Sequence, residues 1–131
     1  MTTTAGWERG KRRKSGSSWA SWLPLVLGIL LTPFALRAAS ILALSGVGGL
    51  MLLYPFVQIV QNPTLHFPGA FADPLAQWIM YLQFPIYGLL MTRTIKSKGF
   101  WIALNMVVLI HAVGIGVAYL LARYQNPYLR L

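Results

Sequence analysis

The sequence has very few acidic residues and no cysteine. Of its 131 residues only Glu8 and Asp73 are acidic, and charged residues of both signs make up 10%. A soluble domain usually carries about 25% charged residues, because its surface must face water. Without cysteine, the chain can form no disulfide, no thiolate nucleophile and no cysteine metal site. The shortage of charge indicates that most of the surface faces something other than water.

Apolar residues are abundant, and the charge that is present is basic. Apolar residues make up 56% of the chain, and eleven Lys and Arg residues give a formal net charge of +9. Membrane proteins place Lys and Arg in flanks and short loops, as here. A nucleic-acid binder instead spreads them along a folded face. We therefore expect membrane lipids and other membrane protein subunits as partners, and no binding to nucleic acid.

The first 18 residues are polar, small and basic, which predicts a disordered cytoplasmic tail ahead of a transmembrane helical domain over residues 19–131. The tail contains the basic run Lys11, Arg12, Arg13 and Lys14. Near an anionic membrane surface each basic residue contributes about 1 kcal/mol to binding. We expect these four side chains to contact lipid head groups.

The apolar run 19–60 is too long to form one helix across a membrane. At 1.5 Å per residue it would be about 60 Å long, twice the roughly 30 Å hydrocarbon core. Thr32-Pro33 offers an N-cap followed by proline at the first helical position, so we expect a break there. This predicts an apolar half-helix over 19–31, re-entrant or covered by a partner, and a transmembrane helix over 33–60.

The rest of the chain predicts two more spans. Prolines and a glycine mark a loop over residues 61–72. Asp73-Pro74 is expected to cap a helix over 73–92, and Ser97 a helix over 99–122. The expected fold is all-α, an integral membrane helical bundle with three transmembrane helices and the N-terminal half-helix. The alternative is four transmembrane helices, with the first span ending before a turn at residues 37–40.

The distribution of basic residues favours three spans with the N-terminus in the cytoplasm and the C-terminus outside. With three spans, nine of the eleven basic residues are cytoplasmic, and only Arg123 and Arg130 lie outside. With four spans the division is seven to four. Because Lys and Arg accumulate on the cytoplasmic side, the first division is the favoured one. A multi-pass protein of the bacterial inner membrane is expected.

Small residues on the expected helices predict close helix–helix contacts. They are Ser45, Gly48 and Gly49 on the helix 33–60, and Ala112, Gly114, Gly116 and Ala118 on the helix 99–122. At 100° per residue, Gly114 and Ala118 share one face with His111, and Ala112 and Gly116 share another with Asn105. Two such faces predict neighbours on both sides of this helix, inside the bundle or in a partner protein.

Gln77 and Tyr81 form a polar stripe on the helix 73–92. Unpaired polar groups in hydrocarbon cost several kcal/mol, so both side chains are expected to hydrogen-bond neighbouring helices. The alternative is a polar path for a small solute or a lipid head group, which would make the protein a small transporter or channel.

His111 lies near the middle of the last expected span, where an ionisable residue suggests a functional site. A neutral imidazole can ligate haem iron or the magnesium of a chlorophyll-type pigment, or bond a quinone oxygen. It can also handle protons, or serve only structure by bonding a Tyr, a Gln or a backbone carbonyl. The sequence leaves these roles open.

The sequence lacks the residue motifs of several common catalytic sites, so no enzymatic activity is expected. The chain has no acid pair for general acid–base catalysis, no His-Glu-x-x-His metal motif and no Gly-Lys-Ser or Gly-Lys-Thr phosphate loop. The expected function is that of a small polytopic accessory or assembly subunit of a larger membrane complex, such as a respiratory or photosynthetic one. The alternatives are a cofactor-binding protein that uses His111, and a small transporter or channel.

Overall fold

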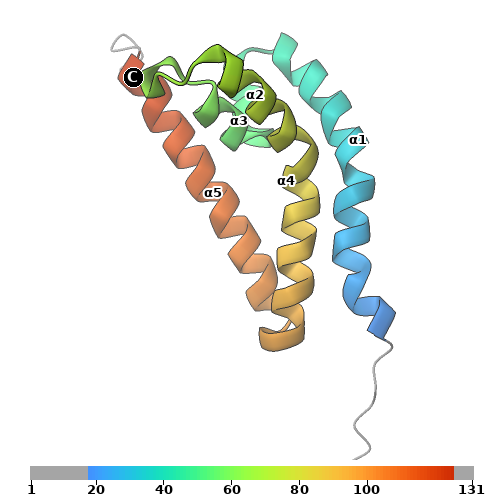
Figure 1. The fold of residues 1–131 in the computed structure, drawn as a ribbon. Coiled ribbons are helices and arrows are strands. Elements are labelled where there is room, and N and C mark those ends of the chain that lie inside the picture. The colour runs from blue at the N-terminus through green and yellow to red at the C-terminus, as the bar shows by residue number, and fades with distance from the viewer. Residues whose placement is uncertain (1–17, 126–131) are drawn as a thin grey trace, which may run out of the picture.

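The computed structural model describes residues 18–125, and this part of the chain is all-helical (Figure 1). Its elements are a 3₁₀ helix η1 (Ser18–Trp22), the helices α1 (Leu23–Leu44), α2 (Val47–Leu53) and α3 (Pro55–Val60), a 3₁₀ turn η2 (Pro63–Leu65), and the helices α4 (Gly69–Lys98) and α5 (Phe100–Gln125). The long helix α4 packs against both α1 and α5, and the short α2 and α3 lie between α1 and α5 at one end (Figure 1). The predicted all-α fold is confirmed, whereas the tail with Lys11, Arg12, Arg13 and Lys14 lies outside the described residues.

The helix α1 continues through Pro33, so the predicted break at Thr32-Pro33 is wrong. A proline inside a helix removes one N–H and costs about 3 kcal/mol. A break in apolar surroundings would leave several peptide groups without partners, at several kcal/mol each. The Thr32 hydroxyl instead donates to the Gly28 carbonyl oxygen at 2.9 Å, inside the helix. Residues 19–31 are therefore the first part of a long helix and its 3₁₀ lead, and not a separate half-helix.

The predicted helix over 33–60 is wrong as well, because the chain breaks twice within it. The first break is at Gly46, whose φ of 99° is a conformation that residues with a side chain rarely adopt. The second is at Tyr54, which precedes Pro55 and has φ −130° and ψ 65°. A residue before proline avoids the helical region, so the helix ends there. The first break separates α1 from α2 and the second separates α2 from α3, and both short helices are far too short to span a bilayer.

The last two helices are both longer than predicted. The Pro68 carbonyl accepts the N–H groups of Phe71 and Ala72, which starts α4 at Gly69 and places Asp73, the predicted cap, inside the helix. The helix α4 then runs to Lys98, and Gly99, with φ 91°, joins it directly to α5. Ser97 is therefore not a cap for α5, since its hydroxyl donates to the Thr94 carbonyl at 3.2 Å within α4.

Two helices are long and apolar enough to cross a membrane, Ala20–Leu44 and Phe100–Gln125. Their outer surfaces carry many exposed apolar side chains, among them Leu44 at 90% exposure and Trp101 at 74%. Large apolar patches of this kind are unusual on a soluble monomer. The fold is consistent with a membrane protein.

Backbone-to-backbone contact at two glycines holds α1 against α4. A Cβ added to Gly28 would collide with the Phe84 carbonyl oxygen. A Cβ added to Gly88 would collide with the Pro24 carbonyl oxygen and would lie 2.7 Å from the Leu25 Cα. Small residues let helix backbones approach closely in lipid, where dispersion contacts and weak Cα–H···O contacts replace the hydrophobic driving force. This reciprocal pair fixes how α1 and α4 cross.

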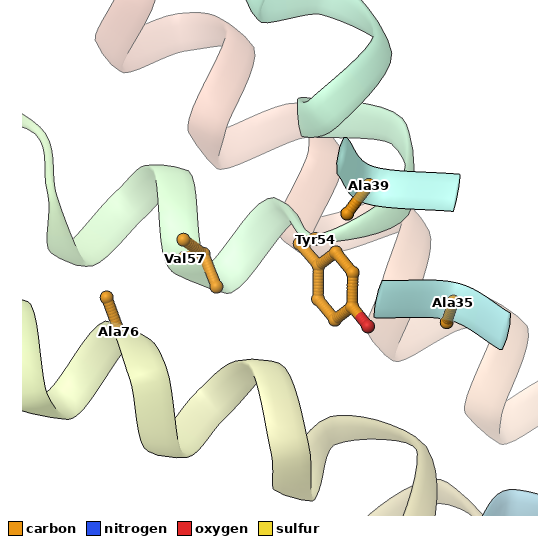
Figure 2. Close-up of a cluster of buried hydrophobic side chains, with 5 residues drawn as sticks. All are labelled: Ala35, Ala39, Tyr54, Val57 and Ala76. Atoms are coloured by element: carbon orange, nitrogen blue, oxygen red, sulfur yellow. The ribbon is translucent and has the colours of Figure 1, made fainter. Parts of the chain in front are cut away.

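Tyr54, at the second chain break, is the centre of the buried core (Figure 2). Its side chain is fully buried, and its ring meets the Phe84 ring edge-on at 5.6 Å between centroids. Figure 2 shows it facing α1, beside Ala35 and Ala39, with Val57 and Ala76 nearby. Because Ala35 and Ala39 have small side chains, α1 leaves room for the large Tyr54 ring.

Candidate functional site

His111 lies near the middle of α5, and both of its ring nitrogens are engaged by the protein. Nε2 is 2.8 Å from the Leu52 carbonyl oxygen, and Nδ1 is 3.0 Å from the Tyr87 hydroxyl. A carbonyl oxygen can only accept, so Nε2 carries the hydrogen and Nδ1 of the neutral ring accepts from Tyr87. His111 therefore joins α5 to the end of α2 and to α4.

The chain break at Tyr54 explains why the Leu52 carbonyl needs a donor. In an unbroken helix the carbonyls of Leu52 and Leu53 would accept the N–H groups four residues later. At the break, side chains from other helices donate instead: His111 to Leu52, and Gln83 Nε2 to the Leu53 carbonyl at 3.0 Å. Peptide groups in apolar surroundings are nearly always paired, so these two side chains supply the hydrogen bonds that the carbonyls lack at the break.

Aromatic rings hold the histidine ring in place. The Tyr87 ring meets the His111 ring edge-on, at 5.8 Å between centroids and an interplanar angle of 81°. The Phe84 ring packs edge-on against Tyr87 at 6.3 Å. To bind haem iron or the magnesium of a chlorophyll-type pigment, His111 would have to give up the present hydrogen-bond partner of one ring nitrogen. The geometry favours a structural histidine bonded to a tyrosine and a backbone carbonyl.

Gln83, to which sequence reasoning assigned no role, is the buried polar residue of α4. It is 4% exposed, and its Oε1 has no hydrogen-bond partner. It lies seven residues after the buried Ala76, which places both on the face toward the core. That spacing indicates a core-facing residue. The role of Gln83 could not be predicted, because the Leu53 carbonyl that it bonds becomes free only at the break at Tyr54, which the sequence does not predict.

Gln77 and Tyr81, the predicted polar stripe, are both exposed on the outer surface of α4. Neither side chain hydrogen-bonds another residue of the described range 18–125, so the predicted bonds to neighbouring helices are not made within this bundle. The reason is that α1 and the α2–α3 pair cover the opposite face of this half of α4, where Ala72, Ala76 and Gln83 are buried. The stripe therefore lines no internal path.

The two small-residue faces of α5 have different surroundings. On the inner face, Ala118 is buried, and a Cβ added to Gly114 would lie 3.0 Å from the Phe56 ring and 3.2 Å from Pro55. On the outer face, Asn105, Ala112 and Gly116 are exposed, and nothing lies within 4 Å of a Cβ added to Gly116. The structure brings the first face into the bundle and leaves the second open.

The prediction that Ser45, Gly48 and Gly49 lie on one helix is wrong, because α1 ends at Leu44 and α2 begins at Val47. Ser45 and Gly48 are exposed. A Cβ added to Gly49 would lie 3.2 Å from the Leu42 side chain, across the corner between the two helices.

Two shallow apolar grooves flank Tyr87. One, of about 410 Å³, lies between α3, α4 and α5, with Gln83 and Tyr87 in its lining. The other, of about 400 Å³, is lined by Tyr87, His111 and Ala112 among others. Residues 18–125 contain no group of three His, Asp or Glu side chains that could hold a metal ion. The candidate site is thus a set of hydrogen bonds, from His111 to Tyr87 and to the Leu52 carbonyl, among mostly apolar side chains.

The comparisons with known proteins give this chain no family. No protein-family model, no curated protein and no solved structure matches it. The class that the structure itself defines is an all-helical protein with two helices long and apolar enough to cross a membrane.

Proposed function

We propose that this protein is a small multi-pass membrane protein that acts as an accessory or assembly subunit of a larger membrane complex. The observation that carries the proposal is the outer face of α5. It combines the exposed small residues Ala112 and Gly116 with the exposed amide of Asn105, on a mostly apolar helix. In lipid, such a face favours close approach of another helix, and Asn105 can hydrogen-bond across the contact.

The packing of α4 supports a third membrane crossing. Lys96, near the end of α4, lies over the Trp22 ring at the start of α1, so these two helices are antiparallel. The single residue Gly99 makes α4 and α5 antiparallel as well. If α1 and α5 cross the bilayer, α4 between them crosses too. The α2–α3 pair is then re-entrant, running from the outer side to the level of His111 and back.

The basic residues support an orientation with the N-terminus in the cytoplasm. Because α1 continues through Pro33, Arg37 falls in its second half, on the outer side with Arg123 and Arg130. The other eight of the eleven basic residues are cytoplasmic in this arrangement. That division still follows the rule that Lys and Arg accumulate in the cytoplasm.

The test is the protein composition of the tagged chain, purified in mild detergent from its native membrane, for the wild type and for Gly116→Leu. We expect the wild type to carry stoichiometric partner subunits, and Gly116→Leu to lower their recovery about tenfold, because the new side chain separates the two helices. The fold should stay intact, since Gly116 has open space around it.

Gly48→Leu is the matched control, because Gly48 is also an exposed glycine with nothing within 4 Å of an added Cβ. It should keep the partner at the wild-type level. Recovery of the wild-type chain without any partner would refute the proposal, and so would an undiminished partner in Gly116→Leu.

A further inference from the structure

The end of the bundle where α1 begins and α4 ends carries a cluster of cations. Arg93, Lys96 and Lys98 are all exposed there. The Lys96 ammonium lies 4.5 Å from the centroid of the Trp22 ring, which links the end of α4 to η1. Because Gly99 leads at once into α5, these cations lie on a tight helical hairpin and not on a long loop.

No acidic side chain in the described range 18–125 neutralises this cluster. Asp73, the one acid in that range, lies in the first turns of α4. At 1.5 Å per residue, it is roughly 30 to 40 Å away from the three cations, at the other end of the helix. That separation is several times the screening length of about 8 Å at physiological salt. The cluster therefore presents unbalanced positive charge.

Aromatic side chains place the cluster at the depth of lipid head groups. Trp22, Phe100 and Trp101 are exposed at the same end of the bundle. Tryptophan prefers the boundary between head groups and hydrocarbon.

We propose that this end, formed by Trp22, Arg93, Lys96 and Lys98, binds the phosphate groups of anionic phospholipids. An arginine guanidinium can bond two phosphate oxygens at once, and lysine ammonium groups add point charges around it. A zwitterionic head group carries its own cation, which the cluster repels. The inference rests on the membrane placement proposed above, and it is independent of the partner complex.

Native mass spectrometry of the full chain in detergent tests this site. The protein is offered equal amounts of phosphatidylglycerol and phosphatidylcholine, and the retained lipids are counted. We expect phosphatidylglycerol to be favoured at least tenfold by the wild type. The triple variant R93Q/K96Q/K98Q should lose most of this preference, because each cation near an anionic head group contributes about fivefold in affinity.

The matched control is Arg123→Gln, which removes an exposed cation from the last turn of α5, at the opposite end. It should keep the preference, and equal helical circular dichroism should verify that all variants are folded. A wild type without preference, or a triple variant that keeps it, overturns the proposal. Displacement of the bound lipid by millimolar glycerol phosphate also overturns it, since the ligand would then be a soluble phosphate. Partner recovery is measured separately, so failure here leaves the accessory-subunit test unaffected.

Discussion

Replacing Gly88 by leucine is expected to separate α1 from α4 and to lower the free energy of unfolding by about 3 kcal/mol. The cause is the backbone of α1, which lies directly against Gly88: the new side chain would meet the Pro24 carbonyl oxygen and the Leu25 Cα. Backbone cannot move aside as a flexible side chain can, so α1 must shift as a whole. Unfolding of the purified protein by increasing sodium dodecyl sulfate, followed by circular dichroism, measures the loss.

A second readout separates helix displacement from general loss of stability. The chain has no cysteine, so Trp22→Cys with Lys96→Cys gives one pair of thiols at the contact between η1 and α4. A short thiol cross-linker should join them in the parent protein and fail to do so once Gly88→Leu is added. Gly48→Leu, which adds the same side chain in open space, should leave stability and cross-linking unchanged. Wild-type stability in Gly88→Leu would show that the two helices do not meet at this glycine.

Replacing His111 by leucine is expected to lower the free energy of unfolding by about 2 to 3 kcal/mol. The change leaves the Leu52 carbonyl and the Tyr87 hydroxyl without partners near the middle of the bundle. In a membrane, a polar group shielded from water without a partner costs roughly 1 to 3 kcal/mol. The same detergent titration measures the effect, and Gln83→Leu should have a similar cost because it unpairs the Leu53 carbonyl.

Two further variants distinguish a structural histidine from a cofactor ligand. Tyr87→Phe removes a single hydroxyl and should cost only about 1 kcal/mol. His111→Gln should recover part of the stability, since an amide can donate to Leu52 and accept from Tyr87. A visible absorption band in the purified protein that disappears in His111→Leu, with stability unchanged, would contradict this account and favour a haem or pigment ligand.

Prolines show how much of the fold can be predicted from sequence. Pro33, Pro74 and Pro85 all lie inside helices, whereas Pro55 begins one. Each of these prolines is flanked by mostly apolar residues, so local propensity cannot separate them. The break before Pro55 is stabilised by side chains that lie 30 and 59 residues from the carbonyls they bond. That is a tertiary effect, which a single sequence does not reveal.

The candidate site is predictable where helical geometry decides it, and not where it depends on tertiary contacts. The depth of His111 and the two small faces of α5 follow from helical geometry alone, and the structure places one face inside and one outside. The role of Gln83 could not follow, because it depends on where α2 ends. The glycine contact between α1 and α4 also escaped prediction, since a close approach needs both helices in register.

Labelling of single cysteines most directly tests the central claim, that three helices cross the membrane with the N-terminus in the cytoplasm. The variants are Gln61→Cys before α4, Ser97→Cys at its end and Tyr124→Cys near the end of α5, all at exposed positions. A membrane-impermeant maleimide should label positions 61 and 124 in intact cells, and position 97 only in inverted vesicles. Labelling of positions 61 and 97 from the same side would show that α4 does not cross, and would contradict the account.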